Sequence, residues 1–81
     1  SILPNPTTHK SILRYNLEKA GLVTVSVVDV SGRPVAKLSS KIGYEGLNEV
    51  SLDVSQLSNG TYYILVESNG KRAMKSIVVN K

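Results

Sequence analysis

Apolar and polar residues alternate along short stretches of this chain, and no stretch shows the period of an amphipathic helix. The alternation is clearest in residues 11–17, "SILRYNL", and 48–54, "NEVSLDV". A period of two is typical of strands that bury one face. In these two stretches every second residue is apolar or aromatic, and these residues are Leu13, Tyr15, Leu17, Val50, Leu52 and Val54. We therefore predict two half-buried strands.

The most apolar stretch, residues 22–30, "LVTVSVVDV", alternates less regularly. Its valines change parity between Val27 and Val28. Such a slip indicates either a β-bulge or a strand that is buried on both faces. A turn at Gly32 leads into "PVAKLSS". We predict that this is a short strand with Pro34 at its first position, where a missing N–H does least harm.

Segments that contain glycine separate the remaining strands. Residues 41–46, "KIGYEG", contain two glycines, and we predict that they form a loop. Asn69 and Gly70 lie between "TYYILVE" and "KRAMKSIVVNK", which are both strand-like. Since both residues of an Asn-Gly pair tolerate φ > 0, this pair predicts a two-residue hairpin of type I′.

The second Asn-Gly pair, Asn59 and Gly60, follows "DVSQLS", which is not strand-like. We predict that this pair ends a connection that crosses from one sheet to the other, with Leu57 filling the core below. Tyr62 stands two residues after Gly60, at the start of a strand. This arrangement is typical of a tyrosine corner, in which the hydroxyl bonds to upstream backbone and fixes the crossing.

Six or seven short strands at a spacing of roughly ten residues predict an all-β, antiparallel two-sheet sandwich. A chain of 81 residues is expected to form one domain. Within it we predict an extended leading segment over residues 1–10, because Pro4 and Pro6 around Asn5 restrict the backbone. The sandwich is then expected to occupy residues 11–81.

Composition removes several classes of function. The chain has no cysteine, so disulfides, thiol nucleophiles and cysteine zinc sites are excluded. The formal net charge is +4, and the basic residues are dispersed apart from Lys71, Arg72, Lys75 and Lys81. We expect no nucleic-acid partner, because such proteins carry a denser basic stripe. The chain starts without Met or an export leader, so we expect it to be part of a longer protein.

Candidates for catalysis are few. His9 is the only histidine, and it lies in the leading segment without an evident acidic partner. Asp29 and Asp53 stand next to predicted turns, where a carboxylate caps backbone N–H groups. Residues 43–46 lack the lysine and the helix of a phosphate-binding loop. We therefore expect no enzymatic activity, no metal ion and no cofactor.

A small carbohydrate-binding or adhesive module is an alternative, because β-sandwiches often bind glycans through exposed aromatic side chains. Tyr44, in a loop flanked by glycines, and Tyr63, of opposite parity to Tyr62, are the candidates. Without tryptophan such a platform would be thin.

Four segments resemble, in order, the segments of one known family. They are "LPNP" at 3–6, "VSVVDVSGRPV" at 25–35, "GLNEVSLDVSQLSNGTYYI" at 46–64 and "NGKRAMKSIVVNK" at 69–81. In this order and spacing, the chain resembles the type A C-terminal sorting domain of the type IX secretion system of Gram-negative bacteria. It departs from the family's pattern at Val28, where many members carry an aromatic residue.

The resemblance implies an immunoglobulin-like sandwich that serves as the C-terminal address of a cargo protein attached to its N-terminal side. The cargo would cross the inner membrane by a signal peptide and pass through the periplasm. The outer-membrane translocon and its shuttle components would then recognise the folded domain. A sortase-type peptidase would remove the domain, and the cargo would stay on the cell surface or be released. The domain would be a substrate of that peptidase and not an enzyme.

The positions that the resemblance assigns to recognition lie in the leading segment, two turns and the last strand. They are Pro4, Asn5, Pro6, Gly32, Gly60, Tyr62, Lys75, Ile77, Val78, Val79 and Lys81. Residues 77–79 are three consecutive apolar residues, so we expect at least one to face outward. An exposed apolar edge strand pairs readily with another chain, which predicts strand-exchanged homodimers at high concentration.

Overall fold

The structure is a computed structural model that describes residues 2–3 and 9–81. Seven strands make up the fold, and the described residues contain no helix. The strands are β1 (Ile2–Leu3), β2 (Lys10–Leu17), β3 (Gly21–Asp29), β4 (Pro34–Gly43), β5 (Gly46–Asp53), β6 (Gly60–Ser68) and β7 (Lys71–Val79). Pro34 is the first residue of its strand, as predicted.

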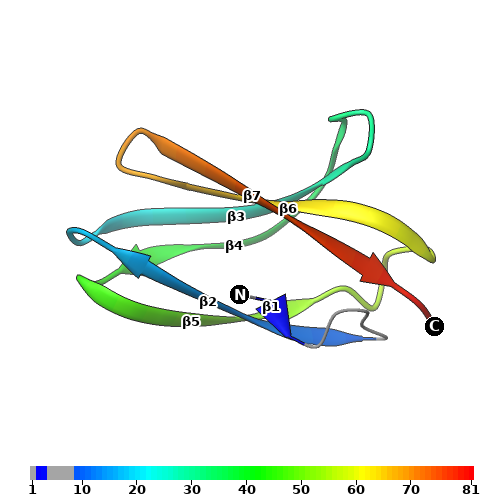
Figure 1. The fold of residues 1–81 in the computed structure, drawn as a ribbon, viewed down its shortest axis with the longest axis horizontal. Coiled ribbons are helices and arrows are strands. Elements are labelled where there is room, and N and C mark those ends of the chain that lie inside the picture. The colour runs from blue at the N-terminus through cyan, green and yellow to red at the C-terminus, as the bar shows by residue number, and fades with distance from the viewer. Residues whose placement is uncertain (1, 4–8) are drawn as a thin grey trace.

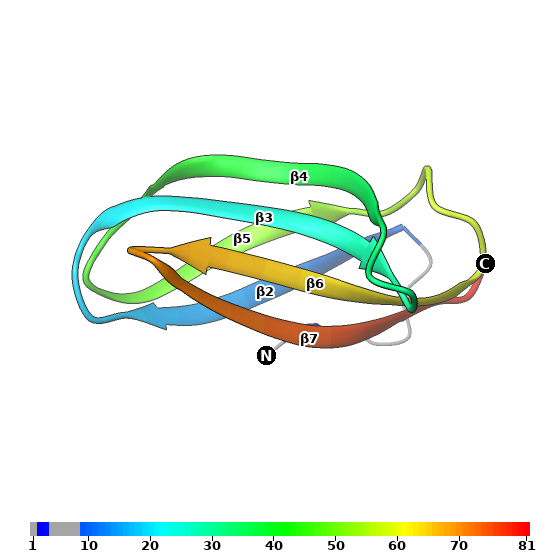
Figure 2. The ribbon, with the colours of Figure 1, turned by 90° about the horizontal axis from the view of Figure 1, so that it is seen from above.

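The strands form two antiparallel sheets that pack face to face (Figures 1 and 2). One sheet has the order β1-β2-β5 and the other β4-β3-β6-β7. The first, second and fifth strands therefore oppose the third, sixth and seventh, as in immunoglobulin domains, and only the fourth strand differs from the constant-type arrangement. The predicted all-β, immunoglobulin-like sandwich is confirmed.

The core lies between the sheets. It consists of apolar side chains at the alternate positions that the sequence pattern predicted to be buried. On β2 and β5, Leu13, Val50 and Leu52 are buried, whereas their polar neighbours face solvent. Aliphatic side chains from both sheets complete the core, and no phenylalanine or tryptophan is present in the chain. The innermost residues are Val23, Val25, Val27, Leu52, Val54, Ile64, Ile77 and Val79.

The slip in the valine pattern of β3 corresponds to an irregular pairing with β4. The register shifts between Val25 and Ser26 and again between Val27 and Val28. Val27 lies in the core, and Val28 is buried outside the core cluster, paired with Tyr63. Both predicted consequences, a bulge and burial on both faces, are therefore confirmed.

The loop predicted for residues 41–46 is wrong. β4 continues to Gly43 and β5 starts at Gly46, so only residues 44–45 connect the two strands. Gly43 is the last residue of β4 and pairs with Gly21, and neighbouring side chains leave no room for a larger residue there. A Cβ atom there would lie 2.6 Å from Leu17 Cδ1 and 2.9 Å from Val23 Cγ2. This glycine permits close packing and does not form a turn.

The predicted hairpin and turn geometries are confirmed. Asn69 and Gly70, the two residues between β6 and β7, have φ of 51° and 77°, as a type I′ turn requires. The Asn69 side chain also donates a hydrogen bond to the carbonyl of Lys19 at 3.2 Å, which joins this turn to the turn between β2 and β3. Gly32, in the turn between β3 and β4, has φ of 88°.

Candidate recognition surface at the C-terminal end

The structure gathers several of the predicted recognition residues at one end of the sandwich. The start of β6 pairs with the ends of β3 and β7, with Gly60 opposite Val79 and Tyr62 opposite both Asp29 and Ile77. Figures 1 and 2 show the C-terminus beside the connection between β5 and β6 at this end. Pro4, Asn5 and Pro6 lie outside the described residues.

The connection from β5 to β6 crosses between the sheets and is fixed from inside. Leu57 is buried in the core cluster, and its N–H donates to the carbonyl of Val54 at 3.0 Å. The Tyr62 hydroxyl donates a hydrogen bond to the carbonyl of Ser58 at 2.8 Å. Gly60 has φ of 152°, a conformation that residues with a side chain rarely adopt. The predicted core plug and tyrosine corner are confirmed in these contacts.

The last residue of the chain is bound to this crossing. The Lys81 N–H donates to Asn59 Oδ1 at 2.9 Å, and the Lys81 ammonium donates to the carbonyl of Ser55 at 2.5 Å. The family resemblance assigned Lys81 to recognition by a partner, and it gave no sign of these two bonds. It also identified Asn59 only as part of a turn, although its amide oxygen holds the C-terminus. The only available signal was a polar side chain next to the glycine that ends the crossing.

The three apolar residues near the end of β7 divide between the two faces of the sheet. Ile77 and Val79 lie in the core, whereas Val78 is 39% exposed, so one apolar side chain does face outward as predicted. β7 is the last strand in the order of its sheet. Lys75 is exposed on the same strand. Of the predicted recognition residues on β7, Lys75 and Val78 are therefore the two that a partner can contact.

The two aspartates beside the turns act as caps, as predicted. Asp29 Oδ1 accepts hydrogen bonds from the N–H groups of Ser31 at 3.0 Å and Arg33 at 2.9 Å. The Ser31 hydroxyl, followed by the Arg33 N–H, lowers the pKa of Asp29. A hydrogen bond from the Ser55 hydroxyl and a second one from its N–H, at 3.0 Å, likewise lower the pKa of Asp53. Both carboxylates therefore accept hydrogen bonds that stabilise the turns.

A candidate metal site is absent from residues 2–3 and 9–81. No three His, Cys, Asp or Glu side chains are grouped there in a way that could hold a metal ion. No described helix is long and apolar enough to cross a membrane. The two tyrosines of the carbohydrate alternative do not form one platform, because Tyr44 lies in the turn after β4 and Tyr63 pairs with Val28 toward the other end.

Comparison with known proteins gives one match. The family model of the secretion system C-terminal sorting domain matches residues 1–80 of the 81-residue chain. No curated protein and no solved structure matches the chain. The matched region contains all seven strands, both Asn-Gly turns and the tyrosine corner. The chain therefore belongs to the family of C-terminal sorting domains of the type IX secretion system.

Proposed function

We propose that this domain is recognised in its folded form by the outer-membrane type IX translocon and its shuttle components, and that it directs an attached N-terminal cargo across the outer membrane. Membership of the family itself implies interaction with the type IX machinery and export to the cell surface or the medium. The family is one of sorting signals and not of enzymes. The match over residues 1–80 is the observation on which the proposal rests.

The recognised surface in this proposal is the exposed part of the edge strand β7. Hydrogen bonds to Ser55 and Asn59 hold Lys81 against the crossing, so the strand is presented in one fixed position. Lys75 and Val78 belong to opposite faces of this edge strand, and both are exposed and available to a receptor. A cation on such a surface steers encounter with acidic receptor groups more than it adds affinity. The sorting unit is proposed to span residues 1–81.

In the same proposal a sortase-type peptidase removes the domain after export. The domain is the substrate of that step. The cargo passes through the periplasm of a Gram-negative bacterium and then remains attached at the surface or is released.

The test uses a reporter that carries a signal peptide at its N-terminus and this domain at its C-terminus, in a host with a type IX system. The intact domain should bring the reporter to the surface. Lys75→Ala should reduce surface display, because it removes an exposed cation without touching the core. Lys37→Ala is the matched control, since Lys37 is exposed on β4, the opposite edge of the same sheet.

Lys81→Ala is a weaker test of recognition, because it also removes the bond to Ser55. Substitutions at exposed positions, such as Lys75→Ala and Lys37→Ala, change the free energy of unfolding by no more than about 0.5 kcal/mol. If Lys75→Ala and Lys37→Ala both export as well as the intact domain, recognition does not involve Lys75. If the intact domain leaves the reporter in the periplasm, the proposed sorting function is wrong.

A further inference from the structure

Both Asn-Gly pairs of the chain have the sequence in which asparagine loses its side-chain amide most readily. The backbone nitrogen of the residue after an asparagine can attack the side-chain carbonyl carbon, and a glycine carries no side chain that obstructs this attack. Both asparagines are exposed to solvent. The sequence therefore does not distinguish Asn59-Gly60 from Asn69-Gly70, whereas the contacts of the attacking nitrogen and of the side chain differ between them.

The Gly60 nitrogen is engaged in the ladder between β6 and β7. Ser68 and Lys71 flank the two-residue turn and exchange two hydrogen bonds, as the residues beside a type I′ turn do. Such exchanging pairs alternate along an antiparallel ladder, and the register is continuous to Gly60 and Val79, which therefore form an exchanging pair as well. The Gly60 N–H is thus committed to the Val79 carbonyl.

The Asn59 side chain is held as well. Its Oδ1 accepts the Lys81 N–H at 2.9 Å, which fixes the carbonyl whose carbon would be attacked. A reaction at this pair requires that both hydrogen bonds open, at the point where the end of β7 meets the crossing between the sheets. The rate is then reduced in proportion to the fraction of molecules in which the site is open.

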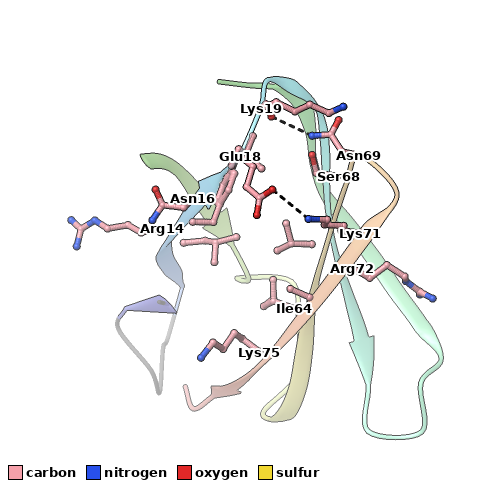
Figure 3. Close-up of a pocket in the computed structure, with 15 residues that line it drawn as sticks. Arg14, Asn16, Glu18, Lys19, Ile64, Ser68, Asn69, Lys71, Arg72 and Lys75 are labelled. Carbon is pink, nitrogen blue, oxygen red and sulfur yellow. Dashed lines mark hydrogen bonds and ion pairs between the residues drawn. The ribbon is translucent and has the colours of Figure 1, made fainter. Parts of the chain in front are cut away.

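The Asn69-Gly70 pair lacks the first of these protections. Gly70 lies in the turn and outside the ladder, and no described residue accepts a hydrogen bond from its N–H. The Asn69 side chain is held by one bond, from Nδ2 to the Lys19 carbonyl at 3.2 Å, which Figure 3 shows as a dashed line. This bond is at the long end of the usual range and is exposed to water, so it opens easily.

We propose that Asn69 is a site of spontaneous deamidation in the folded domain and that Asn59 is protected. The Gly70 nitrogen loses its proton and forms a bond to Asn69 Cγ, the bond from Cγ to Nδ2 breaks, and Nδ2 leaves with that proton as ammonia. Water then adds to one of the two carbonyls of the resulting cyclic imide and opens the ring. The products are aspartate, or isoaspartate, in which the main chain runs through the side-chain carbon.

The modification acts on the contact that joins two turns at this end of the sandwich. Both products have a carboxylate in place of the amide, so the donor to the Lys19 carbonyl is lost and two acceptors face each other. Isoaspartate also adds a carbon to the backbone of a turn in which Asn69 and Gly70 have φ of 51° and 77°. Aspartate should therefore separate the two turns, and isoaspartate should in addition weaken the pairing at the start of β7.

The test incubates the unmodified folded chain at mildly alkaline pH, which favours loss of the amide proton. Peptide mass spectrometry locates deamidation, and enzymatic methylation detects isoaspartate. Asn69 should react at least about fivefold faster than Asn59, because one more hydrogen bond must open at Asn59. In urea that unfolds the chain, the two pairs should react at similar rates. This comparison does not depend on the folding of a variant.

Three variants assign the protection to individual contacts. Gly21→Ala places a Cβ against Asn69 Oδ1 and displaces this exposed side chain from Lys19, so deamidation at Asn69 should become faster. Lys81→Pro removes the N–H that Asn59 binds, so deamidation at Asn59 should become faster. Lys81→Ala is the matched control, because it removes the ammonium and keeps that N–H, and it should leave the rate at Asn59 unchanged.

Several results would overturn the proposal. Equal rates at Asn59 and Asn69 in the folded chain would mean that the ladder gives no protection. An Asn69 that stays intact in the folded chain, while it reacts in urea, would mean that the turn itself prevents the attack. Equal rates at Asn69 for Gly21→Ala and the unmodified chain would exclude the bond to Lys19 as the contact that holds the side chain.

Discussion

Replacing Tyr62 by phenylalanine removes one hydroxyl and keeps the aromatic ring. In the structure that hydroxyl donates to the carbonyl of Ser58 at 2.8 Å, and the ring is packed against the core and half-buried. The substitution removes this hydrogen bond and keeps the packing of the Tyr62 ring. If the tyrosine corner stabilises the crossing between the sheets, Tyr62→Phe should therefore lower the free energy of unfolding without altering the fold.

The expected loss is about 0.5–1.5 kcal/mol, the net contribution of one intramolecular hydrogen bond. Ser58 is exposed, so water can reach its carbonyl after the substitution, and we expect the lower half of this range. For a domain of this size a loss of about 1 kcal/mol shifts the melting midpoint by roughly 4–8 °C. The measurement is urea unfolding followed by circular dichroism, with the slope m fixed by the surface exposed on unfolding.

Tyr63→Phe is the matched control, because Tyr63 is the next residue and its hydroxyl forms no hydrogen bond with another described residue. It should change the unfolding free energy little. Equal midpoints for Tyr62→Phe and Tyr63→Phe would refute the stabilising role of the corner. A changed m value for Tyr62→Phe would show instead that the substitution alters the native or the unfolded state.

Three other predictions concern the same fold. Gly60→Ala should destabilise by about 1 kcal/mol or more, because alanine is strained at φ of 152°, and an unchanged melting midpoint would contradict this. Asp29 has a lowered pKa, so its stabilisation is complete above the unfolded value of about 3.9 and is lost as the pH falls through the folded value. Asp29→Asn should therefore flatten the decline of stability in acid, and an identical pH profile would argue otherwise. The edge strand β7 with exposed Val78 should support strand-exchanged dimers, and light scattering that shows only monomer at millimolar protein would count against them.

The fold was predictable from sequence because its signals are local. Alternation with a period of two identified the buried faces of β2 and β5, and the Asn69-Gly70 pair identified its hairpin through φ > 0. The tyrosine corner was predictable for the same reason, since Ser58, Gly60 and Tyr62 lie within five consecutive positions. Such features depend on residues that are neighbours along the chain.

The features that the sequence did not predict depend on distant residues. Gly43 pairs with Gly21 in a strand, and Leu17 and Val23 exclude a larger residue there, whereas the local pattern of two glycines indicates a loop. The hydrogen bonds from Lys81 to Ser55 and Asn59 span 26 and 22 positions. No local pattern in the last strand predicts them. These contacts follow from how the sheets stack.

The inward-facing positions of β7 are a third case. The row of Lys71, Ala73 and Lys75 alternates with Arg72 and Met74, so both parities mix apolar and charged residues and the sequence does not show which one points inward. Burial of Ile77 and Val79 settles the parity. A lysine that points between two sheets is visible only when both sheets are placed.

The central claim, that this domain is a type IX address, is tested most directly by the location of a reporter in two strains. One strain has the outer-membrane translocon and the other lacks it, and both express the same signal-peptide-bearing reporter fused to this domain. The measurement is the fraction of reporter that an added protease can reach on intact cells. We predict surface exposure only in the strain with the translocon. A reporter that remains in the periplasm of both strains would contradict the claim.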